Sequence, residues 1–388
     1  MKFKIVKEIK ILTIGFLFIL LGYASIQQYT TTFFSEHGLT NLGFEALILV
    51  YLSFTLSSLF SSIFISKLGP KNSVIIGSIF YSLFILSLIT KSYPTIYLSS
   101  ILLGIAASLL WGGGSSYLIR VSNKNNYGKN SGFFNSLSML GPALGLILLG
   151  FISKLFNSNL LFLIFSIFPF IGFLILLKLR NIKVKQKINK FKLLKKSFKS
   201  KTLLKLVSIW FSFYFIYGST IGFIPIKIKD AFGIEYVGIL SSLFYIIPFL
   251  SSYFLGRLSD KIGRKKLLMY SYLVSFSGLI FLYVSNLSIF LLIGVILLAL
   301  REAMIRPLIP ALTGDVSTEK NLECINSLTW TSQQVGIVSS LILSRIWYGN
   351  IIYPISLIVI FISSIIFLRL FKKGIKEIKL KLSKEISS

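Results

Sequence analysis

Twelve apolar runs, each long enough to cross a bilayer, dominate this 388-residue chain. A membrane-spanning helix needs about 20 consecutive apolar residues, and a backbone in lipid must satisfy its own hydrogen bonds. The sequence therefore predicts an all-α membrane protein with twelve transmembrane helices. The expected spans cover residues 11–34, 42–66, 73–91, 94–119, 131–153, 160–178, 203–226, 237–256, 267–284, 287–312, 325–346 and 351–371.

The composition fits this class and argues against several others. The chain is 54% hydrophobic with a mean hydropathy of +0.82, whereas soluble domains are about 45–50% apolar. Its net charge of +29 would suggest nucleic-acid binding in a soluble protein, but here the charge lies in loops and tails. Cys324 is the only cysteine, which excludes an internal disulfide. We expect no enzymatic constellation, no metal or other cofactor, and no nucleic-acid partner.

The basic residues predict the orientation in the membrane. Of the 41 Lys and Arg residues, 34 fall on the side that holds both termini, and five fall on the other side. Cytoplasmic loops carry such an excess of positive charge. We therefore expect a multi-pass protein of the cytoplasmic (plasma) membrane with both termini in the cytoplasm. The lysine-rich, amphipathic tail is expected to lie on the membrane surface.

A basic linker divides the chain into two sets of six spans. Twelve Lys or Arg residues and no acidic residue lie between Lys178 and Lys205. The expected organisation is residues 1–178, a basic cytoplasmic linker 179–202, residues 203–371 and a cytoplasmic tail 372–388. The halves share a glycine spacing, which indicates duplication; the glycines are Gly22, Gly38, Gly43 and Gly69, against Gly218, Gly233, Gly238 and Gly263.

The stretch GRLSDKIGRKK, residues 256–266, is the strongest motif and is expected to be a short loop. Its glycines, Gly256 and Gly263, suit close backbone approach and a tight turn. The motif resembles the signature loop of the major facilitator superfamily of transporters, which implies two pseudo-symmetric six-helix bundles. That resemblance implies that Asp260 and Arg264 form a conformational latch, with Asp260 near the N-terminus of a helix in the opposite half. The first-half copy keeps Gly69 but has Ser66 in place of the Asp.

The first half is similar to a narrower branch, the "uncoordinated" ion-channel-regulator-like members of the superfamily. The similarity covers about residues 20–145 and includes the run Lys67-Leu68-Gly69-Pro70-Lys71 and a stretch through Leu110-Trp111. Because some members of that branch act as regulators, this resemblance implies an alternative function as a non-transporting scaffold or regulator.

Three ionisable residues, Arg301, Glu302 and Arg306, lie near the middle of the expected span 287–312. Such groups cost at least about 2.5–3.5 kcal/mol each on insertion scales and commonly face a cavity with partners. Glu302 and Arg306 are four residues apart and can pair, whereas Arg301 points about 100° away and needs another partner or an anion. The functional interpretation is an arginine that holds an anionic substrate beside a protonatable Glu302. A structural ion pair is one alternative, and a shifted span with Arg306 near the interface is another. Pro307 and Pro310 are expected to break the helix and free carbonyls.

Further polar and aromatic residues are candidates for lining a cavity or for joining helices: Gln27, Gln28, Trp111, Trp330, Gln333 and Gln334. Trp111 is followed by three glycines, which favour close packing. Gly141, Pro142 and Gly145 resemble the Gly-Pro motif on the fifth helix of antiporters, although any bent helix gives the same string.

These observations predict a monomeric secondary transporter that moves a small, anionic organic solute by alternating access, driven by a proton gradient. Its expected partners are that solute, the lipid bilayer and protons.

Overall fold

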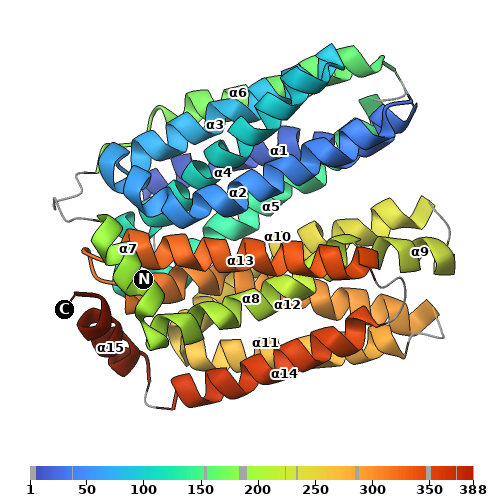
Figure 1. Cartoon of the computed structure of the whole chain (residues 1–388). Coiled ribbons are helices and arrows are strands. Elements are labelled where there is room, and N and C mark those ends of the chain that lie inside the picture. Colours follow the sequence, from blue (N-terminus) through green and yellow to red (C-terminus); the bar gives the residue numbers. More distant parts are fainter. Residues whose placement is uncertain are drawn as a thin grey trace. The chain divides into compact units, whose positions relative to one another are not determined.

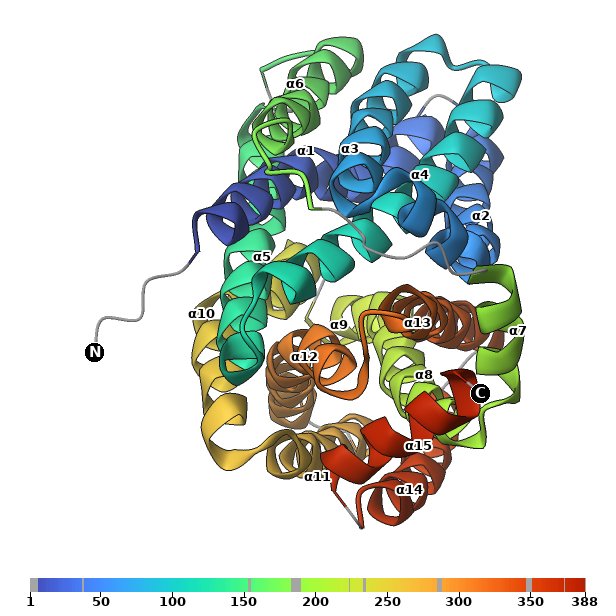
Figure 2. The same ribbon diagram turned by 90° about the vertical axis from the view of Figure 1, so that its left-hand side faces the viewer.

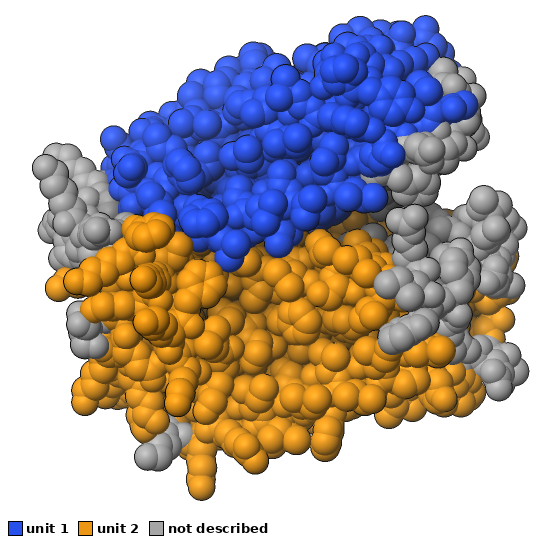
Figure 3. Space-filling view, viewed as in Figure 1, with its two compact units in different colours: residues 1–122, 137–185 blue, residues 123–136, 186–388 orange. Residues whose placement is uncertain are grey.

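A computed structural model of the chain describes residues 6–36, 38–152, 155–182, 190–222, 224–232, 235–284, 288–346, 351–372 and 374–387. Contacts divide the chain into two compact units (Figure 3). Unit 1 consists of residues 1–122 and 137–185, and unit 2 of residues 123–136 and 186–388. Every regular element in the described ranges is helical.

Unit 1 is built from long helices that run alongside one another (Figure 1). They are α1 (Lys7–Glu36), α2 (Thr40–Leu68), α3 (Pro70–Ser87), α4 (Tyr93–Val121) and α6 (Ser158–Leu176), with a short 3₁₀ helix at Leu88–Thr90. The helix α5 (Tyr127–Ile152) contributes residues 137–152 to this unit and residues 127–136 to unit 2.

Unit 2 contains the remaining helices, which include two short ones that the sequence did not predict, α7 and α9 (Figure 1). The helices are α7 (Lys190–Lys199), α8 (Lys201–Gly222), α9 (Ile224–Phe232), α10 (Glu235–Ile262), α11 (Arg264–Tyr283), α12 (Ser288–Val316), α13 (Leu322–Ile346), α14 (Ile352–Leu370) and α15 (Ile375–Ser387).

The same helix pairings occur in both units. In unit 1, α4 packs against α2 and α3, and α6 packs against α1 and α3. In unit 2, α12 packs against α10 and α11, and α14 packs against α8 and α11. The repeated pairing agrees with the predicted fold of two pseudo-symmetric six-helix bundles.

Eleven helices in the described residues are long and apolar enough to span a membrane. The remaining expected span is α13, whose 25 residues give ample length but include many polar side chains. Its Asn326, Thr329 and Gln333 are buried inside the protein. Because these groups face other helices, α13 needs less hydrophobicity than a helix that faces lipid.

The outward faces of the spans are apolar. On α2, Ile48, Leu52 and Leu56 are 47–57% exposed and succeed one another at four-residue intervals. Continuous exposed apolar faces of this kind are rare on monomeric soluble proteins and mark a membrane or a partner surface. With the eleven apolar spans, they identify a multi-pass membrane protein.

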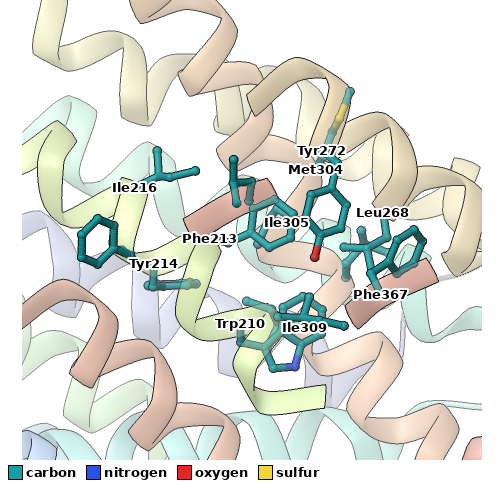
Figure 4. Close-up of a cluster of buried hydrophobic side chains, with 14 of the residues drawn as sticks. Trp210, Phe213, Tyr214, Ile216, Leu268, Tyr272, Met304, Ile305, Ile309 and Phe367 are labelled. Atoms are coloured by element: carbon teal, nitrogen blue, oxygen red, sulfur yellow. The ribbon is translucent and has the colours of Figure 1, made fainter. Parts of the chain in front are cut away.

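The core of unit 2 is rich in aromatic side chains (Figure 4). Trp210 and Phe213 of α8 lie with Tyr272 of α11 and Phe367 of α14, all 4% exposed or less. The ring centroids of Phe213 and Tyr272 are 4.8 Å apart, and those of Tyr272 and Phe367 are 5.2 Å apart. This packing joins α8, α11 and α14.

Two expectations were wrong: one concerned the loop over residues 256–266, and the other concerned the C-terminal tail. The connection expected over residues 256–266 is much shorter, because α10 continues to Ile262 and α11 begins at Arg264. The tail helix α15 buries Ile378, Leu382 and Ile386 in the core of unit 2, and so its apolar face packs on protein, not on the membrane surface.

Candidate functional site

A cluster of three charged side chains lies at the centre of α12. The carboxylate of Glu302 lies between two guanidinium groups: its Oε1 is 2.9 Å from Nη2 of Arg301, and its Oε2 is 3.1 Å from Nε of Arg306. The expected pairing of Glu302 with Arg306 is present, but Arg301 also pairs with Glu302, contrary to the prediction from helix geometry alone. The long arginine side chain bends back far enough to reach its neighbour.

The cluster is anchored to α8 on one side. Arg301 donates through Nη1 to the backbone oxygen of Phe213 at 2.7 Å, and the guanidinium carbon of Arg306 lies 5.2 Å from the ring centroid of Tyr217. Carbonyl and aromatic contacts of this kind stabilise a buried cation. The side chains of Arg301 and Glu302 are fully buried, whereas that of Arg306 is 13% exposed. Of the three, Arg306 is therefore the one whose side chain is partly exposed.

The cluster has an unbalanced charge. Two guanidinium groups face a single carboxylate, and in the described residues no second acidic side chain pairs with either arginine. A buried charge without a counter-ion is costly in a low-dielectric interior. The cluster therefore carries a formal excess of one positive charge.

The prolines of α12 do not break the helix, contrary to expectation, because partners from two other helices satisfy the freed carbonyls. Pro307 cannot donate to the carbonyl of Ala303, which instead accepts from Ser252 Oγ of α10 at 3.2 Å. Pro310 cannot donate to the carbonyl of Arg306, which accepts from Asn135 Nδ2 of α5 at 3.3 Å. These bonds tie α5 and α10 to the helix that carries the charged cluster.

The amide candidates of unit 2, Gln333 and Gln334, lie on α13. Gln333 is fully buried and donates to the carbonyl of Thr329 at 3.1 Å, while Gln334 is 4% exposed. The Oε1 atoms of both glutamines have no hydrogen-bond partner in the described part of unit 2. Trp330 is half-buried on the same helix. Buried amide oxygens without partners are costly and suit a polar ligand or water.

In unit 1, Gln27 donates through Nε2 to the hydroxyl of Tyr51 at 2.6 Å, and both residues are half-buried. Trp111 is half-buried as well and packs edge-on against Phe16, with ring centroids 5.2 Å apart. The side chain of Gln28 lies outside the described residues. The structure thus provides a second polar and aromatic surface, in unit 1.

The glycine candidates of unit 1 are packing sites. A Cβ atom on Gly141 would lie 2.3 Å from the backbone oxygen of Leu17, and one on Gly145 would lie 2.2 Å from that of Leu21. Both positions let α5 approach α1 closely, and α5 continues through Pro142 without ending. The three glycines after Trp111 similarly face α2, α3 and α1.

Asp260 in the last turn of α10 binds the start of α5. Its two carboxylate oxygens accept from the backbone nitrogens of Gly128 at 2.9 Å and Lys129 at 2.7 Å. These are among the first N–H groups of α5, which have no partner inside the helix and carry its positive dipole end. Asp260 therefore serves as a capping anion supplied by another helix.

Arg264 completes this arrangement at the start of α11. It pairs with Asp260 at 2.7 Å and with Asp315 of α12 at 2.8 Å. Two glycines, Gly256 and Gly263, allow α10 to approach the start of α5 and to turn directly into α11. Gly263 has φ +90°, which joins α10 to α11 in one residue, and a Cβ on Gly256 would lie 2.2 Å from the backbone oxygen of Gly128. Gly69, with φ +81°, makes the equivalent junction between α2 and α3.

Sequence reasoning missed several residues of these sites. Asp315 could have been noticed as an acid at the basic end of a span. Asn135, Ser252 and Tyr217 are ordinary polar residues of apolar helices, and only the packing of distant segments reveals their partners.

Comparison with known proteins gives the family. The family model of the Major Facilitator Superfamily matches residues 12–235 and 206–385. The structure of the proton:xylose symporter XylE is similar over 94% of this chain and 95% of that one, with a TM-score of 0.77. At 13% identity this similarity shows the fold alone.

Closer sequence similarity is limited to part of the chain. "UNC93-like protein 3" of Arabidopsis thaliana is 32% identical over 128 residues, which are 32% of this chain and 26% of that protein. The "Putative potassium channel regulatory protein unc-93" of Caenorhabditis elegans is 36% identical over 118 residues, 30% of this chain and 16% of that protein. The matched stretches thus span about a quarter or less of these relatives. The chain belongs to the Major Facilitator Superfamily and resembles its UNC93-like branch.

Proposed function

We propose that this membrane protein is a secondary active transporter that moves a small organic anion by alternating access, coupled to a proton. The observation that carries the proposal is the charge of the α12 cluster: two arginines share one carboxylate, and Arg306 is the accessible member. An anion beside Arg306 would pair with that guanidinium group in place of Glu302.

Glu302 supplies a route for coupling. An anion at Arg306 competes with Glu302 for the same guanidinium group, which lies 3.1 Å from the carboxylate. In this proposal the displaced Glu302 takes up a proton, which also removes its ion pair with Arg301, and Arg301 is then held by the backbone oxygen of Phe213. The empty cluster and the cluster loaded with one anion and one proton carry the same net charge. Loading both together therefore changes no charge inside the membrane, whereas loading either alone does.

Other polar groups fit an organic solute better than a bare inorganic ion. The partnerless Oε1 atoms of Gln333 and Gln334 in unit 2 offer hydrogen-bond acceptors. Binding sites for small molecules commonly combine aromatic surface with a few polar groups.

The contact of Asp260 with α5 serves as a latch in this proposal. Opening the protein at this end requires residues 127–136 to leave Asp260, and closing it restores two charge-assisted hydrogen bonds.

We further propose that the protein is a monomer in the plasma membrane with both termini in the cytoplasm. Accessibility of terminal tags in intact and permeabilised cells tests that orientation.

A panel of small organic anions and cations tests the anion site. The purified chain is heated with each compound at two pH values on either side of neutrality, because a ligand that binds the folded state raises the midpoint. We expect an anion to stabilise the wild type and the control Arg257→Gln, which removes an exposed positive charge from α10. Arg306→Gln should abolish that stabilisation. Equal stabilisation of all three proteins, or stabilisation by cations alone, would contradict the anion site.

The name of the matched protein from Caenorhabditis elegans supports a second candidate function, regulation of a partner membrane protein without transport. A regulator of this kind would bind no solute at Arg306 and would depend on its outward surfaces. Reconstitution separates the two functions, because only a transporter moves a solute in liposomes that contain no other protein.

A further inference from the structure

A basic cavity of about 510 Å³ lies between α8, α14 and α15 of unit 2, where α8 begins and α14 ends. Figure 2 shows α15 beside the neighbouring ends of α8 and α14. Six basic side chains line the cavity: Lys201, Lys205, Arg369, Lys372, Lys381 and Lys384. The lining holds only two acidic residues, Glu377 and Glu385, which leaves an excess of four positive charges.

Both acidic residues are engaged by other groups of the protein. Glu377 pairs with Lys381 at 3.4 Å. Glu385 accepts from Thr202 through the backbone nitrogen at 3.2 Å and the hydroxyl at 2.6 Å, and it also binds Ser200. These bonds cap the start of α8. The carboxylates thus shape the cavity wall, and they neutralise only part of its charge.

The wall formed by α15 is firmly attached. Ile378, Leu382 and Ile386 are 2% exposed or less and belong to the core of unit 2. The basic side chains of α15 are therefore presented by a packed helix and not by a loose tail. A preorganised cavity with this charge binds an anion with less ordering cost than free lysines do.

The position of the cavity connects it to the lipid. Arg369 and Leu370 of its lining end the apolar span of α14. The outward face of that span is apolar, with Phe361 56% and Leu368 55% exposed. Acyl chains can lie along this face while a headgroup reaches Arg369. Basic pockets at the ends of membrane spans bind anionic headgroups in this way.

We propose that this cavity binds a phosphate group, supplied either by the headgroup of an anionic phospholipid or by a soluble organic phosphate. The phosphate lies among the lysines of α8 and α15 and the arginine of α14. Its binding ties the start of α8 to the tail helix and is independent of solute binding at Arg306.

Titration of the purified full chain tests the proposal. Short-chain phosphatidylglycerol, short-chain phosphatidylcholine and glycerol phosphate are added separately, and the thermal midpoint gives an apparent Kd. The pocket variant combines Lys201→Gln with Arg369→Gln. The control combines Lys265→Gln with Lys266→Gln, which removes two exposed charges of α11 outside the cavity.

We expect phosphatidylglycerol to stabilise the wild type and the control. In the pocket variant it should bind about 10-fold to 30-fold more weakly, as expected for loss of two charges near a membrane surface. Stabilisation by phosphatidylglycerol alone identifies the lipid as the source, and stabilisation by glycerol phosphate as well identifies the phosphate group as sufficient. Equal weakening in the pocket variant and the control would overturn the proposal, as would equal stabilisation by phosphatidylcholine or no stabilisation by any of the three.

Discussion

The carboxylate of Glu302 contacts Arg306 at 3.1 Å across one turn of α12, in the middle of an apolar span. Arg301 contacts the same carboxylate at 2.9 Å. Removing the carboxylate should therefore lower the free energy of unfolding more than removing one arginine does.

Glu302→Gln should destabilise the protein more than Arg301→Gln. The first change leaves two buried guanidinium groups without a counter-ion, which costs about 3–5 kcal/mol. The second leaves one balanced pair, Glu302 with Arg306. The thermal midpoints of the purified variants compare them. The double variant Arg301→Gln with Glu302→Gln should be more stable than Glu302→Gln alone, and the reverse order would show that the carboxylate does not balance Arg301.

Asn135→Ala should destabilise the protein through the carbonyl of Arg306. That oxygen lacks an intrahelical donor because residue 310 is proline, and it accepts from Asn135 at 3.3 Å. Leaving it unsatisfied costs about 1–3 kcal/mol. In a Pro310→Ala background the helix regains its own N–H donor, so Asn135→Ala should cost less there. The coupling between Asn135 and Pro310 is measured from the free energies of unfolding of the wild type, both single variants and the double variant. Additive losses would show that Asn135 does not act through the carbonyl that Pro310 leaves free.

Asp260→Asn should loosen the start of α5. The variant loses the charge that faces the N–H groups of Gly128 and Lys129, a contact worth about 0.5–2 kcal/mol for a helix cap. Hydrogen exchange at residues 127–136 should accelerate by about 2-fold to 30-fold. Asp315→Asn is the control, since Asp315 pairs with Arg264 but does not cap α5. Equal acceleration in both variants would argue against a specific cap.

The tail helix should undock in acid. Burial alone raises the pKa of Glu385, but hydrogen bonds from Ser200 and Thr202 outweigh it and hold the pKa below its ordinary value of 4.5. The stabilisation by a carboxylate with a lowered pKa is present above that ordinary value and is lost as the pH falls through the lowered pKa. Limited proteolysis of residues 375–387 should therefore increase in that acidic range. Glu385→Gln should abolish this change, whereas Glu377→Gln should retain it; a pH effect that persists without Glu385 would assign it elsewhere.

The helices were predictable because each span must satisfy a fixed length and hydrophobicity. The expected span 94–119 corresponds to α4 at Tyr93–Val121, and the expected span 351–371 to α14 at Ile352–Leu370. The short helices were harder to predict. The linker helix α7 consists mainly of lysine and apolar residues, and it packs Leu193 and Leu194 into unit 2. The local sequence predicts an amphipathic helix, but it does not show which part of the protein the apolar face of that helix packs against.

The charged cluster was predictable in part, because a membrane span is otherwise apolar. Ionisable residues in an apolar span are conspicuous, so Arg301, Glu302 and Arg306 could be selected from the sequence. Their burial could not, because it depends on Phe213 and Tyr217 of α8. Sequence also could not distinguish the two arginines by exposure, which is 13% for the side chain of Arg306 and zero for that of Arg301.

Uptake by the purified protein in liposomes tests the central claim most directly. Wild type, Arg306→Gln and Arg257→Gln are reconstituted separately, a mixture of small organic acids is supplied outside with an inward proton gradient, and the contents are analysed by mass spectrometry. We predict that at least one organic anion accumulates with wild type and Arg257→Gln but not with Arg306→Gln. Contents indistinguishable from those of empty liposomes for the folded wild type, or equal accumulation with Arg306→Gln, would contradict an anion transporter that works through Arg306.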